Sequence, residues 1–451
     1  MKLVKPALAA ALGAAATVWT IADARAAGFQ LRENSAIGTG ESYAGAVSGN
    51  YDLSTIYNNP AGMTAFTGIM QGGGATLIDP SGHLSNVQGH NIYGASLSDT
   101  DERDPTQAKV IPSAYLLWAP NQDWRLGLAL TVPFGLITSY SGTSAVRYQA
   151  LQSEIETLDI NPNIAYKAND WISIGGGFTV EKVKAKLTNA LDIGGIVGST
   201  LDGIFHTTTN GPALSQTADG RSDVVGTSWG VGYNVGVELT PWGPDTTIGI
   251  AYRSSVHQKL QGRADFTVPS SLATLVATSG ALQKTNATAN LTLPGNAWIG
   301  ITHHFTPAFA VDASYQYTQW SSFKTLEVDF ENPKQPPVVD PENYRDSSFV
   351  SLGANYAFND RLTVRAGTAF DETPVQNKYR DFRLPDGNRY WLSTGATYQL
   401  TQSVAISGAY AHLFIDSGKV KQTDINPIFD TVSATANVDA DIISLSATIT
   451  F

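Results

Sequence analysis

Two motifs in this chain resemble catalytic or metal-binding groups. Gly226-Thr-Ser228-Trp-Gly230 fits the G-x-S-x-G pattern of serine hydrolases, which requires a sharp turn from a strand into a helix. Here the motif lies inside a run of alternating residues typical of a strand. His303 and His304 are neighbours on a strand, so they point to opposite faces and suit one metal ion poorly. We therefore predict that the protein is not an enzyme and uses no cofactor.

Charge and cysteine content exclude further classes. The chain has no cysteine, which rules out disulfides, thiolate metal sites and cysteine catalysis. Its formal net charge of −11, with no basic patch, argues against nucleic-acid binding. The acidic run Ser98-Asp-Thr-Asp-Glu-Arg-Asp104 could bind calcium on a loop, although a solvated loop is the simpler interpretation.

Two long loops carry apolar residues at helical spacing, which is unusual for segments that face water. The first set is Ile193, Ile196, Val197, Leu201, Ile204 and Phe205; the second is Leu272, Leu275, Val276 and Leu282. Exposed apolar surface of this kind suggests a binding site. The alternative is that two helices pack on each other and cap the molecule, and a groove between them would satisfy both interpretations.

The end of the chain shows which elements must position these residues. From Ile443 to Phe451 the odd positions are apolar, whereas Ser444, Ser446, Thr448 and Thr450 fill the even positions. Such a strand has one face suited to lipid and one suited to a wet interior. We predict that the odd positions face lipid and the even positions face a lumen.

Similar alternation recurs from about residue 68 and gives fourteen strands. The predicted spans are 67–78, 110–119, 123–134, 156–168, 170–186, 223–239, 245–260, 286–303, 308–324, 346–358, 361–372, 389–400, 403–415 and 440–451. Tight turns alternate with long loops, and aromatic residues gather near the tight turns: Trp118, Trp124, Trp171, Trp242, Phe305, Phe309 and Phe358. This pattern indicates an all-β membrane protein, a 14-stranded antiparallel transmembrane β-barrel in the bacterial outer membrane.

The first 66 residues differ from the rest. Lys2 and Lys5 precede a small, apolar run that ends at Ala24-Arg25-Ala26, so residues 1–26 read as a secretory signal peptide. Residues 27–66 are rich in glycine and poor in strand signal. We expect them to form an N-terminal hatch that plugs the lumen of the barrel, which would span 67–451.

Several segments together resemble the FadL-type outer-membrane channels for long-chain fatty acids and other hydrophobic compounds. They are Ala27-Gly-Phe-Gln-Leu31, Asn58-Asn-Pro-Ala-Gly62, Leu158-Asp-Ile-Asn-Pro-Asn-Ile-Ala-Tyr166, Tyr317-Thr-Gln-Trp320, Gly367-Thr-Ala-Phe-Asp-Glu-Thr-Pro-Val375 and Leu384-Pro-Asp-Gly-Asn-Arg-Tyr-Trp391. The resemblance runs from residue 27 to the end of the chain and includes relatives that pass monoaromatic hydrocarbons.

The resemblance implies a route for the cargo. A hydrophobic molecule would settle in a groove between the greasy loops, pass to an internal site, and leave sideways into the membrane. The hatch residues that match the family are Phe29, Asn59, Pro60 and Ala61. A kink in the third strand would open the wall at Pro133, Phe134, Gly135 and Leu136, although these residues could also simply end the strand.

The resemblance also implies an internal cation for the carboxylate of a fatty acid. It points to Lys184 in the fifth strand and Arg345 before the tenth, and the alternative for both is a solvated charge at the rim. Lys184 has the same parity as Ile174 and Phe178. Either a bulge intervenes, or Lys184 lies beyond the membrane edge.

We thus expect passive outer-membrane transport of hydrophobic compounds, most plausibly long-chain fatty acids. The alternatives are uptake of monoaromatic hydrocarbons and general diffusion through an open porin. The expected partners are the cargo and the outer-membrane lipids. The resemblance adds a monomeric state and engagement of the barrel-assembly machinery by Phe451.

Overall fold

The alternating segments form one closed antiparallel barrel, which confirms the predicted fold class. The computed structural model describes residues 28–97, 102–103, 105–423 and 430–451. The predicted signal peptide and most of the acidic run at 98–104 lie outside the described residues. The barrel closes where β1 (Ile69–His90) pairs with β21 (Thr431–Thr450), from Met70 opposite Thr450 onward.

The wall has fourteen antiparallel strand positions, and some positions are filled by two consecutive shorter strands. The remaining strands are β2 (Glu102–Arg103), β3 (Lys109–Trp118), β4 (Trp124–Thr131), β5 (Gly135–Ser139), β6 (Gln152–Lys167), β7 (Ile172–Asp192), β8 (Asp219–Leu239), β9 (Thr246–Arg253), β10 (Val256–Thr267), β11 (Thr285–Leu293), β12 (Asn296–Thr306), β13 (Phe309–Thr318), β14 (Thr325–Phe330), β15 (Val338–Pro341), β16 (Ser347–Ala357), β17 (Leu362–Asp371), β18 (Arg389–Thr401), β19 (Val404–Ile415) and β20 (Gly418–Thr423).

Two predicted strands are each broken, which corrects the single spans expected at 245–260 and 286–303, and a third break follows β4, at the kink expected near Pro133. The breaks separate β4 from β5, β9 from β10, and β11 from β12. The last two breaks are neighbours in the wall, because β9 pairs with β12 and β10 with β11. The segments 325–345 and 416–439, expected to be loops, also contain β14, β15 and β20, which lengthen the wall.

The outer face is apolar, as the alternation predicted. In β21, Ile443 and Leu445 are 48% and 62% exposed, whereas Ser444 is fully buried. All seven aromatic residues predicted near the tight turns are exposed. A charged residue on such a surface would cost about 2–4 kcal/mol at the middle of a bilayer, so this face is built for lipid.

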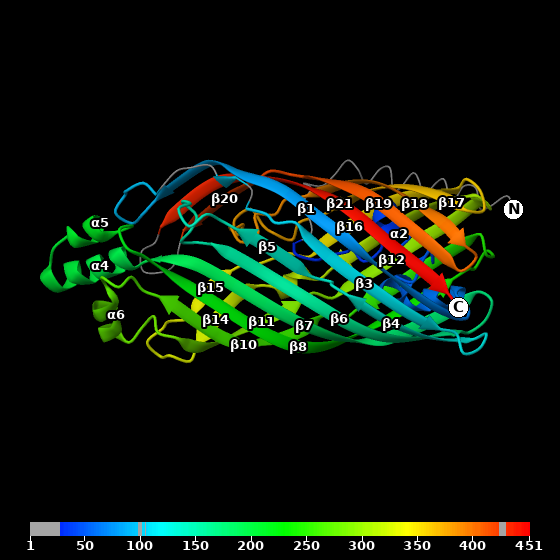
Figure 1. Cartoon of the computed structure of the whole chain (residues 1–451), viewed down its shortest axis with the longest axis horizontal. Coiled ribbons are helices and arrows are strands. Elements are labelled where there is room, and N and C mark those ends of the chain that lie inside the picture. Colours follow the sequence, from blue (N-terminus) through cyan, green and yellow to red (C-terminus); the bar gives the residue numbers. More distant parts are fainter. Residues whose placement is uncertain (1–27, 98–101, 104, 424–429) are drawn as a thin grey trace.

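Figure 1 shows the short turns and the C-terminus at one end of the barrel and three helices at the other. These helices are α4 (Ile193–Phe205), α5 (Asn210–Leu214) and α6 (Ala273–Ser279), and a 3₁₀ turn, η3 (Trp320–Ser322), follows β13. Among the described residues, no helix is long and apolar enough to cross a membrane.

Residues 28–66, called the hatch below, lie against the inner face of the wall. They include α2 (Ala36–Gly40), α3 (Thr55–Asn58) and η2 (Pro60–Ala65). Wall glycines let the hatch backbone approach closely: a Cβ at Gly249 would collide with the carbonyl of Val47, and one at Gly367 with the backbone of Glu41. The glycine content of these strands therefore serves docking as well as turns.

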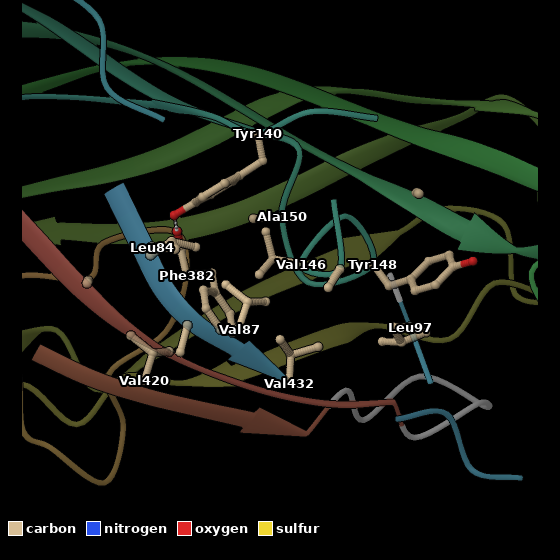
Figure 2. Close-up of a cluster of buried hydrophobic side chains, with 14 residues drawn as sticks. Leu84, Val87, Leu97, Tyr140, Val146, Tyr148, Ala150, Phe382, Val420 and Val432 are labelled. Atoms are coloured by element: carbon tan, nitrogen blue, oxygen red, sulfur yellow. Dashed lines mark hydrogen bonds between the residues drawn. The ribbon is translucent and has the colours of Figure 1, made fainter. Parts of the chain in front are cut away.

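A separate apolar cluster closes the long-loop end of the barrel. Figure 2 shows Tyr140 reaching Phe382, whose carbonyl accepts a hydrogen bond from the tyrosine hydroxyl (2.6 Å). Phe382 is fully buried among side chains of β1, β20 and β21, including Leu84, Val420 and Val432. The segment 373–388 is thereby held against Tyr140 and against β1, β20 and β21.

Candidate functional site

A cavity of about 440 Å³ lies between the start of the hatch and the wall. Its lining is mainly apolar and comes from segments far apart in the chain, among them Leu84, Ile111, Phe134, Leu136, Leu413 and Ile442. The volume falls in the range of about 300–1,000 Å³ that is usual for small-molecule sites. The cavity is thus large enough and apolar enough to hold a hydrophobic ligand.

The wall beside this cavity is open between β3 and β5. β3 pairs with β1 along its whole length, but β4 covers only residues 114–118 of its other edge. The chain then breaks at Pro133, and β5 pairs with β6 instead. Within the described residues, 109–113 therefore lack a strand partner on this side. We call this opening the wall gap.

The cavity reaches the wall gap, since its lining includes Lys109, Val110 and Glu156. Lys109 extends from β3 toward β6, with Nζ 3.5 Å from Glu154 and 3.8 Å from Glu156. Among the described residues, only side chains bridge the gap beside 109–113; beyond it, Ser139 donates its N–H to the carbonyl of Pro105 (2.7 Å). Side chains can move aside without breaking a backbone ladder, which makes the gap suitable as an exit.

The start of the hatch pairs with the kink itself. Leu31 donates its N–H to the carbonyl of Pro133 (2.8 Å), and Gly135 donates to the carbonyl of Phe29 (3.0 Å). The ring of Phe29 packs edge-on against Trp320, with centroids 4.7 Å apart, and also contacts Phe134. The predicted hatch residue Phe29 and the predicted kink residues Phe134, Gly135 and Leu136 therefore meet in one place, and all four line the cavity. Pro133 supplies the break.

The other predicted hatch residues lie deeper. Asn59 is fully buried and donates from Nδ2 to the carbonyls of Val47 (2.8 Å) and Val237 (3.3 Å). Its Oδ1 accepts the N–H of Ala61 (3.2 Å), which caps η2 at Pro60. This turn anchors the hatch to β8, away from the cavity.

Neither cation suggested by the family resemblance lines the cavity. Lys184 lies on the outer face of β7 beside Glu156, with 3.0 Å between Nζ and Oε2. Its parity with the lipid-facing residues already indicated this orientation. Arg345 lies before β16, where its Nη2 is 3.7 Å from Glu372.

A cation that sequence reasoning missed does line the cavity. Arg389, the first residue of β18, is half-buried, and its Nη2 donates to the carbonyl of Gly28 (2.8 Å) and to Asp386 (3.1 Å). Its Nε has no hydrogen-bond partner among the described residues. Asp386 in turn accepts the N–H of Gly28 (2.9 Å), so the arginine is held against the hatch. No spacing pattern marked this residue, because its burial depends on the segment 373–388.

The two loops rich in apolar residues form the helices α4 and α6, which pack on each other as expected in the alternative that two helices cap the molecule. Ile193, Val197 and Val276 are buried in their contact, with Ile196, Leu201, Leu272 and Leu282 half-buried around it. Ile204, Phe205 and Leu275 remain 63%, 66% and 51% exposed. The helices therefore keep an apolar surface beyond what their packing uses.

The residues that suggested enzyme or metal chemistry are ordinary strand residues. Ser228 lies within β8 opposite Val183, with no turn into a helix. His303 Nδ1 lies 2.8 Å from Thr246 Oγ1, and His304 occupies the opposite face of β12.

A closed barrel with a lumenal hatch, an apolar cavity and a wall gap defines a class of outer-membrane channel for hydrophobic compounds. The family model described as outer membrane protein transport protein (OMPP1/FadL/TodX) matches residues 17–451. The chain belongs to this family, whose members are transport channels located in the outer membrane.

Relatives and solved structures agree with this assignment. The chain is 30% identical over 431 residues to the long-chain fatty acid transport protein of Escherichia coli K12, covering 93% of both chains. It is 29% identical to outer membrane protein P1 of Haemophilus influenzae, again covering 93% of each. A FadL homologue of Pseudomonas aeruginosa has a similar fold, with a TM-score of 0.85, 24% identity, and coverage of 94% of this chain and all of that one. The Pseudomonas putida toluene transporter TodX superposes with a TM-score of 0.63 and 18% identity, covering 89% and 94%.

Proposed function

We propose that the protein passes long-chain fatty acids through the outer membrane without consuming energy. The observation that carries this proposal is the apolar cavity, whose lining includes both the half-buried Arg389 and residues of the wall gap. An amphipathic ligand fits this arrangement, because the acyl tail would fill the cavity and the carboxylate would meet Arg389.

The route has three stages. The exposed apolar residues of α4 and α6 capture the molecule outside the cell. It then enters the cavity, where burial of each CH₂ contributes about 0.8 kcal/mol and favours long tails. Movement of the hatch at Phe29 and of Lys109 at the mouth releases it through the wall gap into the lipid.

Arg389 favours a fatty acid over a neutral hydrocarbon. A guanidinium with an unpartnered Nε in a buried site gains a charge-assisted hydrogen bond from a carboxylate. A neutral ring would leave that donor unpaired. Monoaromatic hydrocarbons remain the second candidate, because the similarity in fold extends to a toluene transporter.

Comparing two ligands of equal length tests the assignment. Arg389→Gln should weaken binding of a long-chain fatty acid about tenfold or more, the scale of one charged hydrogen bond, and should leave binding of the matching n-alkane nearly unchanged. Lys184→Gln is the matched control and should alter neither. Arg345→Gln tests the cation favoured by the resemblance. Equal losses for acid and alkane in Arg389→Gln would count against a carboxylate role, and mass spectrometry of the co-purifying ligand would then decide the cargo.

A further inference from the structure

Three carboxylates meet where two long loops touch, away from the cavity lining. Asp340 lies in β15, Glu342 directly follows it, and Asp381 lies in the segment 373–388. One oxygen from each lies within 4.8 Å of the others. Glu342 and Asp381 are only 6% and 5% exposed, and Asp340 is half-buried.

One carboxylate oxygen in this cluster, Asp381 Oδ2, has no hydrogen-bond partner among the described residues. Asp381 Oδ1 accepts the N–H of Leu384 (2.9 Å), whereas Oδ2 is buried. The neighbouring cation, Arg383, donates to Ser153 Oγ (3.1 Å). A buried, unpaired carboxylate oxygen is costly, and this one lies beside two more carboxyl groups.

Mutual repulsion adds to that cost. Burial, and then the charge of Asp340, raise the pKa of Asp381 to about 6. Burial, and then the charges of Asp381 and Asp340, raise the pKa of Glu342 well above its usual value. The charge of Arg383 offsets these effects only in part, so the three carboxylates leave an excess of negative charge.

The three groups are held by fixed backbone on both sides. Asp381 precedes Phe382, which is anchored by Tyr140 and by the cluster of Figure 2. The carbonyl of Arg383 accepts a bond from Thr138 (3.1 Å). On the other side, Asp340 pairs with Leu326 in the β14–β15 ladder, and Glu342 donates its N–H to the carbonyl of Lys324 (3.0 Å).

We propose that Asp340, Glu342 and Asp381 form a binding site for a calcium ion. Calcium takes oxygen ligands at about 2.3–2.6 Å, so two ligands on opposite sides of one ion lie about 4.6–5.2 Å apart. The three oxygens all lie within 4.8 Å of one another, so one ion could contact all of them. Magnesium is smaller, demands octahedral geometry and keeps most of its water, so two buried side chains from different loops suit it less well.

The ion would tie the β14–β15 hairpin to the segment that covers the cavity. Leu384, Pro385 and Asp386 line the cavity, and the N–H of Leu384 donates a hydrogen bond to Asp381. Bound calcium would thus hold in place the part of the cavity lining formed by residues 384–386. The metal site itself does not depend on which cargo the protein carries.

Calcium titration of the whole protein in detergent tests the proposal. After treatment with EDTA and desalting, isothermal titration should find one saturable calcium site per chain. Asp381→Asn and Glu342→Gln, which keep shape but remove charge, should each lower the affinity by about tenfold or more, because calcium affinity depends on ligand charge. Asp265→Asn removes a half-exposed carboxylate of β10 that pairs with Lys284 (3.1 Å) and should bind as the wild type does.

Heat-dependent mobility on gels shows which variants are folded. The proposal is overturned if the folded wild type has no saturable site, or if both cluster variants bind calcium as tightly as the wild type. Magnesium binding as tight as calcium binding would overturn the assignment to calcium.

Discussion

At the scale of single residues, buried charges hold the hatch in the lumen. Arg365 Nε lies 3.1 Å from Glu41 Oε1, and both side chains are almost fully buried. Arg32 makes a similar pair with Asp371 (2.9 Å). Removing one partner of such a pair leaves an uncompensated charge and typically costs about 3–5 kcal/mol.

We therefore predict that Arg365→Gln loosens the hatch and raises ion conductance in planar bilayers. Arg361→Gln, which changes an exposed arginine at a tight turn, is the matched control and should conduct as little as the wild type. If Arg365→Gln conducts no more than this control, the ion pair does not hold the hatch closed. Large, steady openings in the wild type would instead favour a general diffusion porin.

Sequence reasoning succeeded for residues whose role follows from alternation and failed where a loop buries them. Ser444 and Leu445 were assigned to the correct faces because strand parity alone decides them. The parity of Lys184 likewise indicated an outward side chain, against its proposed role in an internal site. Arg389 was missed because the distant segment 373–388 and Gly28 are what enclose it beside the cavity.

At the scale of elements, α4 and α6 offer a surface that their own packing leaves exposed. We predict that replacing Ile204, Phe205 and Leu275 together by serine slows uptake at low fatty-acid concentration, because less apolar area remains for capture. Uptake at saturating concentration should change little, since the cavity is intact. Kinetics of labelled fatty-acid uptake would reveal this; a loss only at saturation would point away from a capture role.

The breaks in the wall were only partly visible in the sequence. Pro133 marked the break between β4 and β5, because proline cannot donate to a ladder. The break at Ser254-Ser255 carries no such signal. It lies beside the break between β11 and β12, because β9 pairs with β12 and β10 with β11, and this adjacency is a tertiary feature.

At the scale of the whole molecule, the lipid-facing exterior and the cargo route are separate features. Phe451 is 74% exposed at the end of β21, far from the cavity lining. We predict that deleting Phe451 lowers the amount of folded protein in the outer membrane. Fatty-acid uptake per folded molecule should stay the same, as quantitative blotting with parallel uptake assays would show. Altered cargo preference in the deletion variant would contradict this separation.

The central claim is that cargo leaves through the wall gap. The chain has no cysteine, so a single thiol introduced by Leu136→Cys at the gap can be modified selectively. Gly142→Cys provides the control, since a side chain there meets no atom within 4 Å. Transfer of labelled fatty acid into the lipid of proteoliposomes should fall to background when a bulky maleimide modifies Leu136→Cys, and should persist in the modified control. Unchanged transfer by fully modified Leu136→Cys protein would contradict lateral exit.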